Sequence, residues 1–315
     1  MKQTDFALHL HKYFTFHLPS IRGVAPSTID SYRHTFILFL TFLQEILSIQ
    51  ADRVQCSDLS RDNVLDFLEW LERARGNSVA TRNQRQAGIN SFVRYLEYVY
   101  PEYIAEYQRI LGIHVKKAPQ KEISYLKTDG VKLFMDQIDV EEKDGLRDYV
   151  MMTILYTTGI RVSELINIRV KDLSLHEPVS LLVHGKGRKS RFVPLIRFTI
   201  PYIQKYIACQ GYESSNKQNE WLFKNHMGNQ FSRQGINHII NKYKKRARRV
   251  DETKVPGDFS PHKMRHTTAM GLVDSGVDLI YIRDLLGHVS VKTTEVYARA
   301  DLHKKRLAIE AASRE

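Results

Sequence analysis

Apolar residues in the first third of the chain recur at the spacing of buried helical faces. The first run has intervals of three and four residues and consists of Ile29, Tyr32, Phe36, Phe39 and Leu43. Ser27 followed by Asp30 resembles a capping arrangement, so we expect this helix to start close to Ser27. Similar runs begin at about Asp62 and after Ser78. The pattern predicts a compact helical domain over residues 1–112.

The periodic pattern stops in the segment GIHVKKAPQKE, which runs from Gly112 to Glu122. This segment is basic, contains Pro119 and has no apolar period, which is typical of a connection between domains. We interpret residues 113–122 as a linker. Its lysines either follow a phosphate backbone or are incidental solvated charges.

The remainder of the chain, residues 123–315, mixes helical patterns with one strand-like stretch. The sequence VSLLVHGKGRKSRFVPL has two short apolar runs, separated by a turn that contains Gly185 and Gly187. Two strands are too few for a doubly wound sheet. We therefore predict a mainly α protein whose second domain is mostly helical and includes a small antiparallel β-sheet.

Charge narrows the class of partner. The chain has 47 Lys and Arg against 35 Asp and Glu, a net charge of +12. Such an excess favours a polyanion, because each neutralised phosphate releases condensed counterions. The same composition also fits an ordinary basic protein, so charge alone does not assign a function.

Cysteine usage and hydropathy indicate the compartment. The two cysteines are too few for a disulfide framework and have no metal-ligand spacing, which suits a reducing cytosol. The N-terminus has no apolar core like that of a signal peptide. The longest uncharged stretch, Tyr149 to Ile160, is shorter than the about 18 apolar residues of a membrane span. We expect a cytoplasmic protein without membrane association.

Residues suited to phosphoryl chemistry are concentrated in four short segments of the second domain. They are TGIRVSEL (158–165), HGKGRK (184–189), HKMRH (262–266) and LGH (286–288), and Tyr297 follows nine residues after His288. Each has an ordinary explanation when taken alone. Arg161 beside Glu164 is usually a surface ion pair, Lys186 between two glycines a solvated turn residue, and a lone tyrosine a packing residue.

Together these segments supply two arginines, a lysine, two histidines and a tyrosine, a set suited to phosphoryl transfer without a metal. The planar fork of arginine matches phosphate oxygens and stays charged at any working pH. Two such groups can stabilise the charge of a five-coordinate transition state. A phenol can attack once that field favours the phenolate, and a lysine can protonate the leaving oxygen. The lack of a carboxylate cluster argues against two-metal hydrolysis.

The four segments resemble the tyrosine recombinase (phage integrase) family, most closely its compact Xer-type members. The family pattern T-G-x-R-x-x-E-L, G-K-G, H-x-x-R and L-G-H, with a tyrosine nine residues on, is matched by TTGIRVSEL, HGKGRK, PHKMRH and LLGHVSVKTTEVY. The stretch WLFKNHMGNQFSRQGI is similar to the family's segment ahead of H-x-x-R. In the first third, STIDSYRHTFILFLTFL and ATRNQRQAGINSFVRYL look like its helical, SAM-like core-binding domain, a DNA clamp.

The resemblance implies a role for each matching residue. Tyr297 would be the nucleophile that forms a 3′-phosphotyrosyl bond. Arg161 and Arg265 would clamp the scissile phosphate, and His288 would add a hydrogen bond to it. This chemistry conserves the energy of the broken bond in the phosphotyrosine, so no metal and no nucleotide cofactor is expected.

Three further residues complete the implied set. Lys186 would protonate the leaving 5′-hydroxyl, and His262 would assist proton movement at the tyrosine. Glu164 would orient the active site without touching the phosphate. None of the six family positions departs from the pattern.

Further basic residues are candidates for DNA contact, although a solvated helix face or hairpin is the ordinary interpretation of each. They lie in the first domain, on the hairpin and in the run NKYKKRARR, and comprise Arg82, Arg85, Arg188, Lys189, Arg191, Lys244, Lys245 and Arg246.

The partner expected from the resemblance is double-stranded DNA, bound by a homo-oligomer. Four protomers would exchange two duplexes through a Holliday junction. The segment ARADLHKKRLAIEAASRE after Tyr297 would dock on a neighbouring protomer, the alternatives being docking within its own chain or fraying. Two rival functions remain: a type IB topoisomerase-like enzyme that nicks and reseals, and a catalytically inactive DNA-binding regulator.

Overall fold

The structure is a computed structural model that describes residues 3–119, 124–142, 144–185 and 190–287. The chain divides into two compact units, residues 1–120 and 121–315, and this boundary falls within the segment interpreted as a linker. The described residues form helices α1 to α12 and a three-stranded antiparallel sheet. The predicted fold class, mainly α with a small antiparallel sheet, is confirmed.

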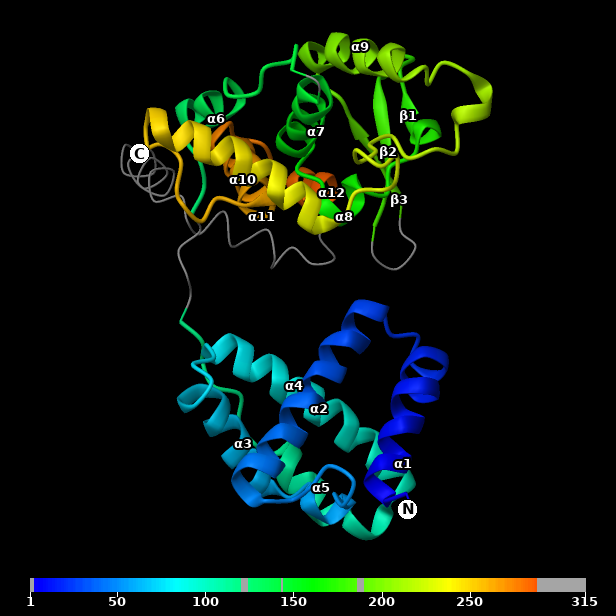
Figure 1. Ribbon diagram of the computed structural model, residues 1–315, viewed down its shortest axis with the longest axis vertical. Helices are drawn as coiled ribbons and strands as arrows, with labels where there is room; N and C mark the ends of the chain where they lie inside the picture. Colours follow the sequence, from blue (N-terminus) through cyan, green and yellow to red (C-terminus); the bar gives the residue numbers. More distant parts are fainter. Residues whose placement is uncertain (1–2, 120–123, 143, 186–189, 288–315) are drawn as a thin grey trace, which may run out of the picture. The chain divides into compact units, whose positions relative to one another are not determined.

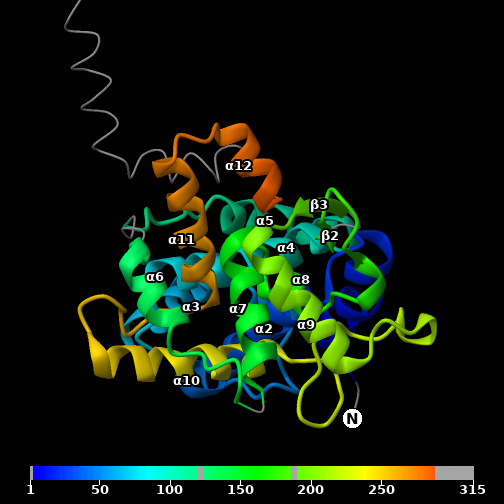
Figure 2. The ribbon, with the colours of Figure 1, turned by 90° about the horizontal axis from the view of Figure 1, so that it is seen from above.

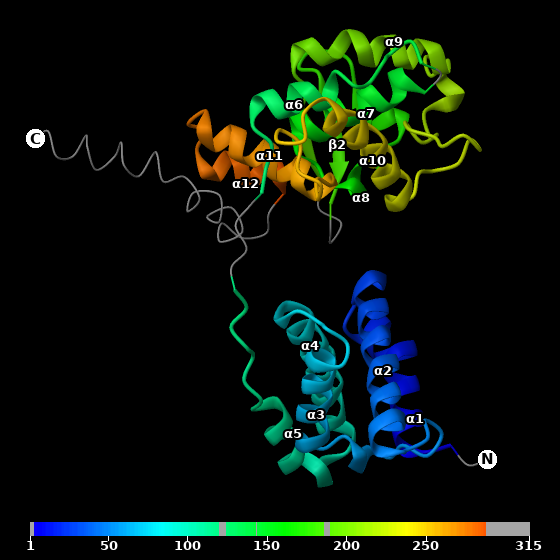
Figure 3. The same ribbon diagram turned by 60° about the vertical axis from the view of Figure 1, so that its left-hand side comes forward.

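The first unit is entirely helical in the part that the structure describes (Figures 1 and 3). A π-helical stretch, Tyr13–Ile21, continues α1, and two short 3-10 turns cover Cys56–Asp58 and Pro101–Tyr103. Its α-helices are α1 (Asp5–Lys12), α2 (Pro26–Leu47), α3 (Arg61–Arg73), α4 (Val79–Val99) and α5 (Ile104–Leu111).

Aromatic rings fill the core of this unit. Phe36 and Phe92 are buried with ring centroids 5.0 Å apart in an edge-on pair, and Phe6 lies 5.7 Å from Phe92 in the same geometry. Such pairs add to the free energy gained from burying apolar area. The core thus joins α1, α2 and α4, as the periodic positions of α2 and α4 predicted.

Side-chain caps explain where two of these helices begin. The hydroxyls of Ser60 and Ser78 accept hydrogen bonds from the backbone at the starts of α3 and α4. The predicted cap of α2 at Ser27 is wrong. This helix begins one residue earlier, at Pro26, because proline is already preorganised for the first helical turn.

The second unit contains seven α-helices among the described residues (Figure 2). Short 3-10 turns cover Val170–Asp172, Arg197–Thr199 and Ser215–Lys217. The helices are α6 (Thr128–Met135), α7 (Gly145–Thr158), α8 (Val162–Leu165), α9 (Ile200–Gln210), α10 (Arg233–Val250), α11 (Pro261–Asp274) and α12 (Leu279–Leu286).

Helix α7 lies in the middle of this unit and packs against α8, α9 and α11 (Figure 2). Nine of the fourteen residues of α7 are buried, including Met151, Met152 and Ile154. Helices α8, α11 and α12 gather on one side of the unit, and α9 lies on the opposite side (Figures 1 and 3). The central helix therefore supports the helices that carry the sequence motifs.

The sheet consists of β1 (Leu173–Ser174), β2 (Ser180–His184) and β3 (Ser190–Pro194), in that order and antiparallel. The two predicted strands are β2 and β3, and sequence reasoning missed the two-residue β1. Leu181 pairs with Val193 and Val183 with Arg191, so Leu181, Val183 and Val193 face the core. This register turns the side chain of Arg191 toward the same face as Val183.

Candidate active site

The turn between α7 and α8 places the first motif arginine. Gly159 ends α7 with a φ of +60°, and a β-carbon there would lie 2.5 Å from Leu286 Cδ2. Only glycine meets both demands without strain. The chain then extends through Arg161, the N-cap of α8, so the arginine projects from the start of a helix.

Glu164 holds Arg161 in two ways. Its Oε2 accepts the Arg161 backbone N–H at 2.8 Å, and its Oε1 accepts Arg161 Nη1 at 2.9 Å. The side chain of Glu164 is only 4% exposed, that of Arg161 39%. Burial alone would raise the pKa of Glu164, but hydrogen bonds from Arg191 and from the Arg161 backbone outweigh it, so this pKa lies below its ordinary value. Glu164 is therefore an ionised anchor, as its predicted orienting role requires.

The second motif arginine comes from α11, which starts at Pro261 behind a Ser260 cap. Arg265 is 4% exposed, and its Nη1 and Nη2 donate to the backbone oxygens of Gly159 and Leu286 at 2.5 and 2.8 Å. Arg161 Nη2 donates to the next carbonyl along the chain, that of Gly287, at 3.1 Å. The structure thus brings the two arginines together at the end of α12.

Gly287 closes α12 in a conformation that suits glycine. Its φ is +65°, and a β-carbon would lie 2.7 Å from Nη1 of Arg191. The glycine of the L-G-H motif is explained by this contact and by its left-handed backbone. The residue that follows it in the sequence, His288, lies outside the described residues, as do Lys186, Arg188, Lys189, Tyr297 and the segment after Tyr297.

His262 lies on α11 beside both arginines. Burial, then the charges of Arg265 and Arg161, lower the pKa of His262 from its ordinary 6.5. The ring of His266 meets that of His262 edge-on, with centroids 4.2 Å apart. Burial, together with the charges of His262, Arg265 and Lys263, lowers the pKa of His266 to about 4. Both imidazoles are therefore neutral near pH 7, the state in which His262 can accept a proton.

His184, the residue two before Lys186, holds the last pair of the β2–β3 ladder, where β2 ends and β3 begins. Its Nδ1 lies 2.8 Å from Ser190 Oγ and its Nε2 lies 3.3 Å from Oδ1 of the buried Asp172. One ring thereby joins β2, β3 and the 3-10 turn ahead of β1. The strands on both sides of the G-K-G turn are thus fixed to the body of the unit.

The first-domain candidates for DNA contact have intramolecular partners. Arg82 is 3% exposed and its Nη1 donates to Gln86 Oε1 at 2.5 Å. Arg85 Nη1 donates to the backbone oxygen of Ser31 at 3.1 Å. These contacts account for both arginines within the helical core of the first unit, and DNA contact by either remains a prediction.

The basic run on α10 divides into two kinds of residue. Lys244 donates to the Gly257 and Phe259 carbonyls at 2.8 and 3.2 Å, and Arg246 donates to Glu142 at 3.1 Å. Lys245 is exposed. The contacts of Lys244 and Arg246 fix α10 to its neighbours, whereas Lys245 extends from the surface. Phosphate contact by the run stays a prediction.

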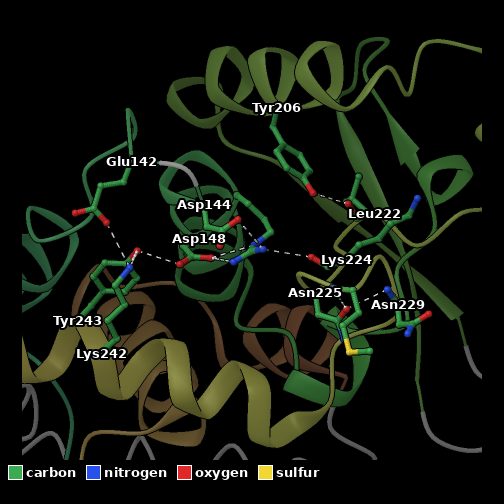
Figure 4. Close-up of polar contacts among 12 residues, drawn as sticks. Glu142, Asp144, Asp148, Tyr206, Leu222, Lys224, Asn225, Asn229, Lys242 and Tyr243 are labelled. Atoms are coloured by element: carbon green, nitrogen blue, oxygen red, sulfur yellow. Dashed lines mark hydrogen bonds and ion pairs between the residues drawn. The ribbon is translucent and has the colours of Figure 1, made fainter.

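A buried carboxylate ties α7 to α10 (Figure 4). The side chain of Asp148 is 3% exposed, accepts Arg147 Nη2 at 2.8 Å and accepts the Tyr243 hydroxyl at 2.9 Å. Burial raises the pKa of Asp148, against the lowering effect of Arg147 and Tyr243. This network holds the central helix against α10, and no motif in the sequence predicted it.

Sequence reasoning missed the partner of one arginine. Arg191 was a candidate for DNA contact, and the structure shows that its guanidinium donates to both oxygens of Glu164, at 3.2 and 3.0 Å. Its side chain is only 16% exposed. The register of β3 was the available signal, because Arg191 pairs with the buried Val183.

Two family models match the chain. The model described as the phage integrase family matches residues 124–304, and the phage integrase N-terminal SAM-like domain matches residues 12–98. Together they cover both units, in the order that the sequence motifs predicted.

Individual relatives agree with these matches. Tyrosine recombinase XerD of Oceanobacillus iheyensis is 32% identical, over 90% of this chain and 91% of the relative. Tyrosine recombinase XerC of Herpetosiphon aurantiacus is 31% identical, over 90% and 88%. A crystal structure of XerH site-specific recombinase bound to palindromic difH substrate, 21% identical, superposes with a TM-score of 0.72 over 91% of this chain and 80% of that chain. The last comparison supports the fold.

Proposed function

The chain belongs to the phage integrase family and is a tyrosine site-specific recombinase, and from this premise we propose that it cleaves and rejoins DNA through a covalent bond to Tyr297. The Tyr297 phenolate oxygen attacks the scissile phosphorus, and the bond from phosphorus to the 5′-oxygen breaks. The products are a 3′-phosphotyrosyl bond and a free 5′-hydroxyl. The phenol loses one proton and the leaving oxygen gains one, so the step balances without a cofactor.

The observation that carries the proposal is the convergence of Arg161 and Arg265. Arg161 and Arg265 donate to the carbonyls of Gly287 and Leu286 at 3.1 and 2.8 Å, although more than a hundred residues of chain separate the two arginines. Two guanidinium groups at one place supply the charge that a five-coordinate phosphate needs in the transition state. Lys186 is the proposed acid and His262 the proposed proton acceptor.

The neutral state of His262 supports its assignment. A group that accepts a proton from the phenol must be unprotonated at working pH, and the lowered pKa of His262 meets this condition. Glu164 acts on the reaction only through Arg161, because both of its oxygens are occupied by Arg161 and Arg191.

The proposed partner is double-stranded DNA, exchanged between two duplexes by a homotetramer through a Holliday junction. Solved structures of similar fold support DNA as the partner: XerH has been solved on difH substrate, and a lambda integrase fragment as a dimer on a COC′ core site. The C-terminal segment is proposed to dock on a neighbouring protomer. The proposed location is a bacterial cytoplasm, where the DNA would be chromosomal or that of a phage or mobile element. In the part of the chain that the structure describes, no helix has the length and apolar character to cross a bilayer.

The test is capture of the covalent adduct. DNA that remains bound to the denatured protein, recovered from the host and sequenced, would identify the site. On that site Tyr297→Phe should form no adduct while its DNA affinity stays within a few-fold of the unchanged chain. An adduct that persists in Tyr297→Phe would assign the nucleophile to another residue. Relaxation of supercoils without exchange between two duplexes would instead favour the topoisomerase.

A further inference from the structure

Arg191 lies on β3 with its side chain turned into the unit. Its Nε donates to the Leu285 carbonyl at 2.9 Å, and its two terminal nitrogens donate to the two oxygens of Glu164 at 3.2 and 3.0 Å. A paired, two-oxygen contact of this kind fixes both the distance and the plane of the carboxylate. Arg191 thus connects β3 with α8 and with the last turn of α12.

Arg191 and Arg161 share one partner, Glu164, which accepts from both. Their guanidinium groups also donate to two carbonyls of the same stretch of chain, Leu285 for Arg191 and Gly287 for Arg161. Gly287 lies so close to Arg191 that an added β-carbon would meet its Nη1 at 2.7 Å. The carboxylate that orients Arg161 is therefore itself held in place from β3.

We propose that Arg191 is a positioning residue for DNA cleavage, which acts through Glu164 and the end of α12 to hold Arg161 at the scissile phosphate. The inference rests on the proposed function. Its physical basis is geometric: without Arg191, the contacts of Glu164 go to Arg161, the residue that it orients, whereas Arg191 ties the same carboxylate to β3. A shift of about 1 Å in a group that binds the transition state can cost on the order of 100-fold in rate.

The chemistry of the side chain explains why arginine is needed. Lysine carries the same charge as a single ammonium, which cannot reach two carboxylate oxygens and a carbonyl with one rigid fork. Contact with the DNA backbone is the competing role for Arg191. It is disfavoured by the three contacts above and by a side chain only 16% exposed.

The experiment measures single-turnover adduct formation on a nicked duplex that carries the site recovered with Tyr297. Arg191→Met should slow the step about 10- to 100-fold, with DNA affinity within a few-fold of the unchanged chain. Arg197→Met is the matched control, because it removes the same charge from an exposed position just beyond β3. Arg197→Met should stay within threefold.

A second substrate distinguishes a defect in stabilising the phosphate from a defect in protonating the leaving group. With sulfur in place of the bridging 5′-oxygen, the leaving thiol has a pKa of about 8.5, so it departs as a thiolate without being protonated by an acid. Arg191→Met should remain slow on this substrate, because its defect lies at Arg161, whereas Lys186→Met should recover. Glu164→Gln should be slow as well, and the double variant no slower than the slower single variant.

Several results would overturn the inference. They are cleavage by Arg191→Met within threefold of the unchanged chain, full recovery on the sulfur substrate, or a loss of affinity as large as the loss of rate. If Arg191→Met does not fold, the cleavage rate of Arg191→Lys is measured instead. Cleavage by Arg191→Lys at the rate of the unchanged chain would refute the inference. Failure of the proposed function looks different, since the unchanged chain would then form no adduct at Tyr297.

Discussion

Arg161 and Arg265, the two arginines proposed to clamp the phosphate, should differ in what they contribute to stability, although we expect cleavage to need both. Arg265 is 4% exposed and donates to two buried carbonyls. The side chain of Arg161 is 39% exposed, and Glu164 keeps Arg191 as a partner when Arg161 is removed. The comparison of Arg161→Ala with Arg265→Ala therefore separates chemistry from folding.

The magnitudes follow from these contacts. Each hydrogen bond from a charged donor contributes about 1.5–3 kcal/mol, so Arg265→Ala loses two of them and leaves two carbonyls unsatisfied. Relief of the buried charge offsets part of this. The net loss should be about 3 kcal/mol. Because the side chain of Arg161 is 39% exposed, solvent screens both its ion pair and its one carbonyl contact, so Arg161→Ala should lose about 1 kcal/mol in all. Both variants should cleave about 100-fold more slowly or worse.

Urea unfolding can resolve the difference. The chain has two tryptophans, Trp70 in the first unit and Trp221 in the second, so a Trp70→Phe background reports the second unit alone. A difference of 2 kcal/mol corresponds to a midpoint shift of about 1 M urea. Equal stability losses in the two alanine variants would refute the reasoning, as would cleavage by either within a few-fold of the unchanged chain.

Three further outcomes are expected. Asp148→Asn should lower the free energy of unfolding by about 2–3 kcal/mol, because Arg147 loses its buried charged partner and is left with the more exposed Asp144; a loss below 1 kcal/mol in urea would contradict this. Lys245→Gln should reduce the slope of log affinity against log salt by about one, whereas Lys244→Gln, which removes a hydrogen-bonded ammonium, should not; titrations at several salt concentrations decide. The pKa of His266 is about 4 in the folded chain against 6.5 when free. The folded state therefore has its full stability above pH 6.5 and loses stability as pH falls toward 4. After allowance for solvent screening this amounts to about 1–2 kcal/mol, and His266→Phe should show a smaller loss between pH 7 and 5.

Much of the chemistry could be predicted from residue types in order along the chain. Guanidinium groups stay charged and imidazoles titrate near neutrality wherever the fold puts them, so the motif residues indicated phosphoryl transfer before any contact was known. The helical faces of α2, α3 and α4 and the strands β2 and β3 were equally accessible, because they depend on periods of a few residues.

The sequence did not predict which group each of these charged side chains contacts. Arg161 meets Gly287, 126 residues away, Arg265 meets Gly159, 106 residues away, and Arg191 meets Leu285, 94 residues away. Such pairs arise from how helices pack, which local periodicity does not encode. Arg82 and Arg191 have the same side chain that serves a DNA surface, and only packing in the folded chain decided that both are largely buried and contact partners within the chain. Residue types specify what a site can do, whereas packing selects which of those residues share one carboxylate or one carbonyl, because a hydrogen bond needs its partner within about 3 Å.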